Sequence, residues 1–385
     1  MPTTSSGGQG REGVTGQHGI APPPLFVQPD SVTILGTYKC TAACEHCCFD
    51  SNPFLTKRLL LADIIGFIDE ASRLPSCKLV VFSGGECFLL RHDLVAAIRH
   101  ATSLGLRTRC VTNGYWAKRL AHGRKRLNEL VDAGLAELNI STGDFHQRWI
   151  DQTTVINAAC LSVEKGLEKT VVVVELQRER RVTAAGLRAD TRIQALTDAD
   201  NDRFKILESP WMPMRYDEVI AQPAGSLLNQ ANLHLRTGCT SIFRTIVVTP
   251  ERRLGYCCGL TRERIPELNV EWDGGRLNGA LEAGGRDFLK IWLYVDGPER
   301  ILAWAAGKDP RIQWENRYAH HCHSCLALFD DPIVREVIKS QYRERVNDVL
   351  ARYVARLRVQ QGHTFGPGDN VGSSEVHSSH YWQTT

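Results

Sequence analysis

The sequence predicts an α/β fold, a partial (β/α)6 barrel of the TIM type with a small C-terminal extension built from a β-hairpin and helices. Two observations support this. Six short runs rich in β-branched residues alternate with segments of helical periodicity between residues 31 and 212, and a hairpin pattern follows them. Such alternation is typical of a parallel sheet with helices outside it. Right-handed crossovers curl such a sheet toward a barrel.

The predicted elements follow one another in a regular order. The strands are expected at residues 32–35, 78–82, 107–112, 136–141, 169–176 and 204–209. The helices are expected at 58–74, 92–104, 117–133 and 151–166, with a weaker helix before the sixth strand. In barrels of this kind, functional residues lie at the carboxyl ends of the strands. The loops that follow the strands are therefore where chemistry is expected.

Beyond about residue 212 the pattern changes. Residues 243–259 are typical of a hairpin that turns at Pro-Glu-Arg-Arg, and 286–295 of a short helix. Residues 332–358 predict one long amphipathic helix. Its apolar stripe is expected to pack on its own domain, the alternative being a partner surface. The stripe comprises Ile333, Val337, Ile338, Val346, Val349, Leu350, Tyr353 and Leu357.

These patterns divide the chain into five expected segments. They are a disordered arm over 1–30, the partial barrel over 31–212, a cysteine-bearing region over 213–331, the amphipathic helix over 332–360 and a disordered tail over 361–385. The two tails are expected to be disordered because they are rich in Gly, Ser, Thr and Pro, which cannot bury a core.

Composition narrows the possible functions. The chain has 385 residues, of which 43% are hydrophobic and 23% charged, with a net charge of +3. These values are ordinary for a globular protein and do not indicate a nucleic-acid or membrane partner. The sequence has neither a membrane-length apolar run nor a signal-peptide pattern, so a cytoplasmic setting is expected. In that reducing compartment, clustered cysteines indicate metal or iron–sulfur ligands rather than disulfides.

Four cysteines crowd the loop after the first predicted strand. Cys40, Cys44 and Cys47 have the spacing C-x3-C-x2-C, and Cys48 follows directly. Consecutive side chains point in different directions, so Cys47 and Cys48 are not expected to face one ion together. Three thiolates suit a four-iron cluster that keeps one iron open to a small molecule. A zinc site completed by His46 or by a distant fourth ligand is the alternative.

This cysteine spacing after the first strand of a βα-barrel resembles the radical SAM superfamily, and the resemblance covers residues 32–210. It implies that Cys40, Cys44 and Cys47 bind a [4Fe–4S] cluster whose open iron binds S-adenosyl-L-methionine (SAM). His46 precedes the third cysteine, where the family often has an aromatic or apolar residue near adenine. Its ring can stack there.

Further matches follow the next strands. "FSGGEC" (82–87) resembles the Gly-Gly-Glu motif of the family, "TNG" (112–114) ends the third strand, and Ser141 ends the fourth. The resemblance implies that the two glycines let the backbone approach the methionine end of SAM, because no Cβ obstructs it. The implied SAM contacts are Gly84, Gly85, Glu86 (to the amino group), Asn113 (a polar contact) and Ser141 (to the ribose or carboxylate).

The loops after the fourth and fifth strands hold further candidates. Arg178, or one of the two arginines that follow it, can pair with a carboxylate of SAM or of the substrate. Asp144 and His146 are candidates for a general base. The alternative for Asp144 is a loop cap that binds backbone amides. Cys258 is a candidate hydrogen-atom donor to a substrate radical.

A second set of cysteines lies in the C-terminal region. Cys239 precedes the hairpin, Cys257 or Cys258 ends it, and "CHSC" supplies Cys322 and Cys325. This order resembles the twitch type of extension, a shortened SPASM domain. It implies one auxiliary [4Fe–4S] cluster with four protein ligands, with Cys257 preferred over Cys258. A structural zinc site on the same thiols is the alternative.

The resemblance implies an oxidoreductase that reductively cleaves SAM to a 5′-deoxyadenosyl radical and abstracts a hydrogen atom from its substrate. The substrate expected first is a ribosomally made peptide that becomes cross-linked, oxidised or epimerised. The alternative is oxidation or epimerisation of a small molecule, such as an aminocyclitol or sugar, in natural-product biosynthesis. A second alternative is a non-catalytic iron–sulfur or zinc protein. Flavodoxin or ferredoxin is the kind of electron donor implied.

Overall fold

The computed structural model describes residues 26–198, 202–257, 260, 265–271 and 277–360. The predicted tail over 361–385 lies outside the described residues, as do Cys258 and most of the predicted arm over 1–30. No helix in the described part of the chain is both long enough and apolar enough to cross a bilayer.

One nine-stranded sheet runs through the molecule, in the strand order β6-β5-β4-β3-β2-β1-β7-β8-β9. The six predicted strands are confirmed as its parallel part, with small shifts at their ends. They are β1 (Ser31–Leu35), β2 (Leu79–Ser83), β3 (Arg107–Thr112), β4 (Glu137–Thr142), β5 (Lys169–Leu176) and β6 (Phe204–Pro210). In β5 most residues are buried on both faces, as expected for a parallel strand between a core and covering helices.

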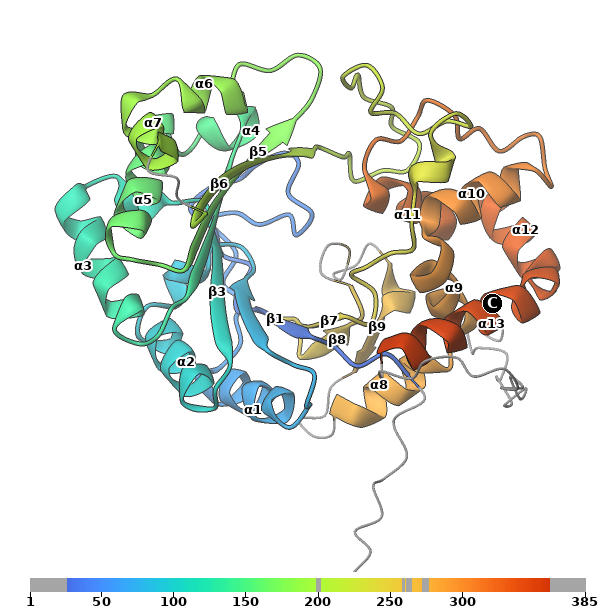
Figure 1. The fold of residues 1–385 in the computed structure, drawn as a ribbon, viewed down its shortest axis with the longest axis horizontal. Helices are drawn as coiled ribbons and strands as arrows, with labels where there is room; N and C mark the ends of the chain where they lie inside the picture. The colour runs from blue at the N-terminus through green and yellow to red at the C-terminus, as the bar shows by residue number, and fades with distance from the viewer. Residues whose placement is uncertain (1–25, 199–201, 258–259, 261–264, 272–276, 361–385) are drawn as a thin grey trace, which may run out of the picture.

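Helices follow the strands and cover the outer side of the curved sheet (Figure 1). The main ones are α1 (Leu61–Ser72), α2 (His92–Ser103), α3 (Leu120–Val131) and α5 (Gln152–Glu164), close to the predicted ranges. Shorter elements are η1 (Cys87–Leu90), η2 (Tyr115–Ala117), α4 (Asp144–Gln147), α6 (Ala184–Arg188) and α7 (Thr191–Asp198). In α1 the buried Ile64, Phe67, Ile68 and Ala71 form one face at helical spacing.

The predicted hairpin continues this sheet. β7 (Thr245–Val248) pairs antiparallel with β8 (Arg253–Gly255), which pairs with β9 (Asn269–Glu271). β7 also pairs in parallel with β1, from Ser31 opposite Thr245 to Ile34 opposite Val248. The sheet therefore continues past the boundary expected near residue 212. Local patterning shows a hairpin but cannot show that its first strand joins a strand more than two hundred residues away.

The C-terminal helices pack together on the other side of the molecule (Figure 1). They are α8 (Leu277–Gly285), α9 (Phe288–Asp296), α10 (Pro298–Ala306), α11 (His321–Asp330), α12 (Pro332–Gln341) and α13 (Arg343–Gln360), with η3 (Leu233–Leu235) and η4 (Pro266–Leu268). The short helix predicted over 286–295 is confirmed as α9.

The prediction of one continuous helix over 332–358 is wrong, because the helix is interrupted at Tyr342. α12 packs on α10 and α11, whereas α13 packs on α9, and the change of partner requires a change of direction. The ring of Tyr342 lies 5.6 Å from that of Phe288. The apolar stripe packs on the protein's own core, where Val337, Val349 and Leu357 are buried.

Candidate functional site

The loop after β1 brings the three predicted cluster ligands together at the carboxyl edge of the sheet. The Cys47 amide donates to the Cys44 carbonyl at 3.0 Å, which turns the loop back on itself. The sulfur of Cys40 accepts from the amide of Ala42 at 3.4 Å and from Nδ2 of Asn113 at 3.5 Å. Burial raises the pKa of both Cys40 and Cys44 to about 12. A bound cation is therefore what would keep these thiols as thiolates.

The sulfurs of Cys40, Cys44 and Cys47 do not all lie within 4.8 Å of one another. Within the described ranges, the sole set of three potential ligand atoms that close together is His46, His146 and Glu175. A four-iron cluster is larger than a single ion and accommodates sulfurs that lie farther apart.

Cys48 is partly buried and packs, as Cys47 does, against the small apolar cluster of Leu35, Tyr38, Phe49 and Val247. That Cys47 rather than Cys48 is the third ligand stays a prediction from the sequence.

The Gly-Gly-Glu loop after β2 lies against the chain that leads to Cys40. Gly84 has a φ of +122°, and a Cβ there would lie 2.4 Å from the carbonyl oxygen of Thr37. A Cβ at Gly85 would lie 2.3 Å from the carbonyl oxygen of Lys39. The Gly85 amide donates to Thr37 at 2.7 Å, and the amide of Glu86 donates to Lys39 at 2.9 Å. The close approach is therefore to the protein's own backbone, and the role toward SAM stays a prediction.

The side chain of Glu86 is fully buried and joins the ends of β2 and β3. Its carboxylate accepts from the hydroxyl of Thr112, 2.9 Å from each oxygen, and from the amides of Phe88 and Asn113 at 3.0 and 2.9 Å. Burial raises its pKa to about 7, although these hydrogen bonds oppose the shift. With its carboxylate engaged in this way, its bond to the amino group of SAM stays a prediction.

The amide of Asn113 faces the cysteine loop. Nδ2 donates to Oγ1 of Thr41 at 3.0 Å and to the sulfur of Cys40, and Oδ1 accepts from the amide of Tyr115 at 3.1 Å. The structure thus brings Asn113 beside the first cluster ligand.

Among the predicted catalytic residues, Asp144 acts as a loop cap. Its carboxylate accepts from the backbone amides of Arg181, at 3.0 and 3.1 Å, and Val182, at 2.8 Å. This is the alternative considered for Asp144 in the sequence. Ser141 lies partly buried in β4, and the side chain of Arg178 is exposed.

His46 and His146 meet at Glu175, a residue that the sequence analysis missed. Nε2 of His46 and Nδ1 of His146 each lie 3.4 Å from Oε2 of Glu175. The ring of His46 also stacks on Phe145, with centroids 4.9 Å apart. Burial and the neighbouring His146 lower the pKa of His46 to about 4, although Glu175 opposes the shift. In the sequence, Glu175 could have been noticed as the one carboxylate near the end of the otherwise apolar strand "KTVVVVEL".

The second cysteine set also gathers in space. Cys325 lies near Cys239 and Cys257, and burial raises its pKa well above the usual range. Cys322 lies in the first turn of α11, one helical turn before Cys325. As in the first loop, no three of the described cysteine sulfurs lie within 4.8 Å of one another.

A histidine supports this second set. Nδ1 of His321 lies 2.7 Å from Oε2 of Glu299, and Cys239 is close enough to interact with the ring. Although burial acts the other way, these partners raise the pKa of His321 to about 9, and His321 in turn lowers the pKa of Cys239. Burial of Cys239 acts to raise its pKa, but the interaction with His321 outweighs this effect.

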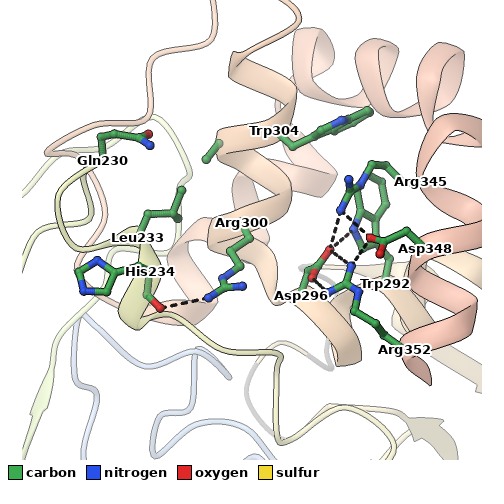
Figure 2. Close-up of a pocket in the computed structure, with 11 residues that line it drawn as sticks. Gln230, Leu233, His234, Trp292, Asp296, Arg300, Trp304, Arg345, Asp348 and Arg352 are labelled. Carbon is green, nitrogen blue, oxygen red and sulfur yellow. Dashed lines mark hydrogen bonds and ion pairs between the residues drawn. The ribbon is translucent and has the colours of Figure 1, made fainter. Parts of the chain in front are cut away.

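A separate pocket of about 630 Å³ lies among α9, α10, α13 and η3 (Figure 2). Asp296 accepts from Nε1 of Trp292 at 2.9 Å. It also accepts from the two terminal guanidinium nitrogens of Arg352, Nη1 and Nη2, at 2.5 and 3.1 Å. Arg300 donates to the carbonyl oxygen of His234 at 3.1 Å. The lining of this pocket contains none of the predicted site residues that the structure describes.

Comparison with known proteins finds a family match for the segment that contains the cysteine loop. Residues 34–159 match the family model of the Radical SAM superfamily. This segment runs from β1 through the cysteine loop to α5. The chain therefore contains a radical SAM domain.

Two curated relatives each align with about a third of the chain. The PqqA peptide cyclase of Xanthomonas euvesicatoria pv. vesicatoria is 34% identical over 129 residues, which cover 32% of this chain and 31% of the relative. The putative peptide biosynthesis protein YydG of Bacillus subtilis is 24% identical over 119 residues, covering 31% and 37%. The chain thus spans about a third of the length of these relatives.

A solved structure, native anSMEcpe with bound AdoMet and Kp18Cys peptide, aligns over 84% of this chain and 99% of that chain. Its TM-score is 0.46 and its sequence identity is 10%, so the likeness has no bearing on function.

Proposed function

We propose that this protein is a radical SAM enzyme that modifies a ribosomally made peptide by cross-linking, oxidation or epimerisation. The observation that carries the proposal is the convergence of Cys40, Cys44 and Cys47 within the segment that matches the Radical SAM family. The whole activity is proposed, because the match covers residues 34–159 alone.

In this proposal the three cysteines hold a [4Fe–4S] cluster that also binds SAM. The bound pair supplies a 5′-deoxyadenosyl radical, which can take a hydrogen atom from an unreactive C–H bond. The protein's part is to bind and orient. Asn113 donates to the Cys40 sulfur, and Glu86 holds the turn that carries Asn113. Hydrogen bonds of this kind tune a cluster's potential.

The peptide substrate is favoured by the relatives. The two curated proteins are described as a cyclase of the PqqA peptide and as a putative peptide biosynthesis protein. Oxidation or epimerisation of a small molecule is the second candidate, because the second cysteine set resembles an extension that also occurs in enzymes acting on small molecules.

The second cysteine set is proposed to hold an auxiliary [4Fe–4S] cluster in a twitch-type extension. Cys239, Cys257, Cys322 and Cys325 supply four thiols, of which Cys239, Cys257 and Cys325 lie close enough to interact. Such a cluster can accept an electron, which suits a net two-electron oxidation. Flavodoxin or ferredoxin is the proposed donor to the first cluster.

Mass spectrometry tests the proposed substrate class. The reconstituted protein would be reduced with dithionite in D₂O with SAM and a synthetic peptide encoded beside its gene. We expect a loss of two hydrogens for a cross-link or oxidation, or gain of one deuterium for an epimerisation. The Cys44→Ala variant is the control and should leave the peptide unchanged. An unmodified peptide, in a reaction that still forms 5′-deoxyadenosine, would contradict the peptide assignment and leave the radical chemistry in place.

A further inference from the structure

Three potential ligand atoms converge beside the cysteine loop, from three separate elements. Nε2 of His46 comes from the loop after β1, Nδ1 of His146 from α4 and Oε2 of Glu175 from β5. All three atoms lie within 4.8 Å of one another, and both nitrogens lie 3.4 Å from the oxygen. The side chains are mostly buried, with exposed fractions of 17%, 16% and 7%.

These distances are too long for good hydrogen bonds but fit metal ligands. Nδ1 of His146 and Oε2 of Glu175 have no hydrogen-bond partner, although both atoms are buried. Leaving buried polar groups unsatisfied is costly. Ligands about 2.1 Å from a tetrahedral ion lie about 3.4 Å from each other. An ion at the centre of this group would therefore satisfy both atoms at the separation observed.

The surrounding residues hold the three ligands in place. The amide of Phe145 donates to Oε1 of Glu175 at 3.0 Å, which leaves Oε2 facing the two imidazoles. The ring of Phe145 stacks on His46. Gly143 has a φ of +151°, and a Cβ there would lie 2.0 Å from Cγ of Glu175, so only glycine leaves room for this carboxylate. Outer contacts of this kind orient metal ligands.

We propose that His46, His146 and Glu175 form a mononuclear site for a divalent metal of the zinc class, separate from the clusters. Two imidazoles and one carboxylate are ligands that such metals accept. Three protein ligands leave a fourth position open, where a carbonyl or carboxylate oxygen of a substrate can bind. The site does not depend on the proposed radical chemistry. It gives His46 a different role from the adenine contact predicted from the sequence.

Metal analysis of the cluster-loaded full-length protein tests the site. The protein is equilibrated anaerobically with zinc sulfate and desalted, and its zinc and iron are measured by mass spectrometry. We expect His146→Ala and Glu175→Gln to lose about one zinc per chain relative to the wild type, as one three-ligand site predicts. Iron should be unchanged, which also shows that the variants fold. His122→Ala, a change at an exposed histidine on α3, is the matched control and should keep the zinc.

Cobalt provides a second readout that separates this site from the cysteines. Cobalt(II) bound by nitrogen and oxygen ligands shows weak visible bands without the intense thiolate charge-transfer band. We expect these weak bands in the wild type and their loss in Glu175→Gln. Equal zinc in the wild type and both variants would overturn the site. A loss of SAM affinity in His146→Ala at unchanged zinc content would assign the group to the nucleoside and would also overturn it.

Discussion

Nδ2 of Asn113 lies 3.5 Å from the sulfur of Cys40, which links the end of β3 to the cysteine loop. The same nitrogen donates to Oγ1 of Thr41 at 3.0 Å, so the amide is fixed from the loop side as well. The backbone amide of Asn113 donates to the buried carboxylate of Glu86. Two motifs far apart in the sequence therefore position one donor at the first predicted cluster ligand.

Replacing this donor should make the first cluster harder to reduce. A hydrogen bond to a ligand sulfur stabilises the added negative charge, so Asn113→Ala should lower the reduction potential at unchanged iron content. A redox titration followed by electron paramagnetic resonance measures the shift. Asn128→Ala, on α3, is the control. An unchanged potential in Asn113→Ala would show that this contact does not influence the cluster.

Adjacent cysteines should behave in opposite ways. Cys44→Ala should lower iron from about eight to about four atoms per chain, if the chain holds two four-iron clusters. Cys48→Ala should leave iron content nearly intact, because consecutive side chains point in different directions and Cys47 is the predicted ligand. Iron and sulfide assays on anaerobically prepared protein provide the comparison. Loss of the first cluster in Cys48→Ala would mean that the loop is wrongly assigned.

The auxiliary site makes its own prediction. Cys325→Ala should remove about four irons per chain while 5′-deoxyadenosine formation persists, because the first cluster is separate. The control is Cys160→Ala, a change at a partly buried cysteine of α5 that packs on the core. A wild-type protein with about four irons and a bound zinc that Cys325→Ala removes would instead favour the zinc alternative for this set.

The Gly-Gly-Glu loop should tolerate no side chain at Gly85. An added Cβ would lie 2.3 Å from the carbonyl oxygen of Lys39, which is backbone and cannot move aside cheaply. We expect Gly85→Ala to cost about 1–3 kcal/mol of unfolding free energy. Gly66→Ala is the matched control, because nothing lies within 4 Å of a Cβ there and alanine favours helix α1. Urea denaturation measures the unfolding free energy of both variants. Equal unfolding free energies for Gly85→Ala and Gly66→Ala would contradict the predicted clash.

Asp296 should give the C-terminal helices a pH-dependent stability. Burial acts to raise its pKa, but the hydrogen bonds from Arg352 and Trp292 hold the pKa below its usual value. A carboxyl with a lowered folded pKa stabilises the protein above its unfolded pKa of about 3.9, and this contribution is lost as the pH falls through the folded pKa. Asp296→Asn should therefore cost about 1–3 kcal/mol near pH 7.

Thermal unfolding of the wild type and Asp296→Asn across pH 3 to 8 tests this. The gap between the two melting temperatures should be constant above pH 6 and narrow below about pH 4. A gap that stays constant down to pH 3 would show that the ion pair with Arg352 does not depend on this ionisation.

Local sequence patterns predicted much of the fold. β-branched runs such as "KTVVVVEL" indicated the parallel strands because burial on both faces requires continuous apolar residues. The pairing of β7 with β1 could not be predicted, since strand order is a long-range property. The interruption of the helix at Tyr342 could not be predicted for a related reason. An apolar stripe shows which face is buried but not that its two halves pack on different helices.

In the candidate site, too, local features could be predicted from the sequence and long-range contacts could not. The spacing of Cys40, Cys44 and Cys47 lies within one loop and could be read directly. Glu175 carries only a weak local signal, because its contacts with His46 and His146 form only when β5 brings together residues that are far apart in the sequence. The SAM contact of Glu86 stays a prediction, whereas its buried bonds to Thr112 and to the Asn113 amide appear only once β2 and β3 are side by side.

Formation of 5′-deoxyadenosine from SAM after dithionite reduction tests the proposed radical chemistry most directly, measured by chromatography for the wild type and Cys44→Ala under anaerobic conditions. If Cys40, Cys44 and Cys47 hold a SAM-binding cluster, the wild type forms 5′-deoxyadenosine and methionine in equal amounts and Cys44→Ala forms none. Full activity in Cys44→Ala, or no product from wild-type protein that carries its full iron content, would contradict the proposed radical chemistry.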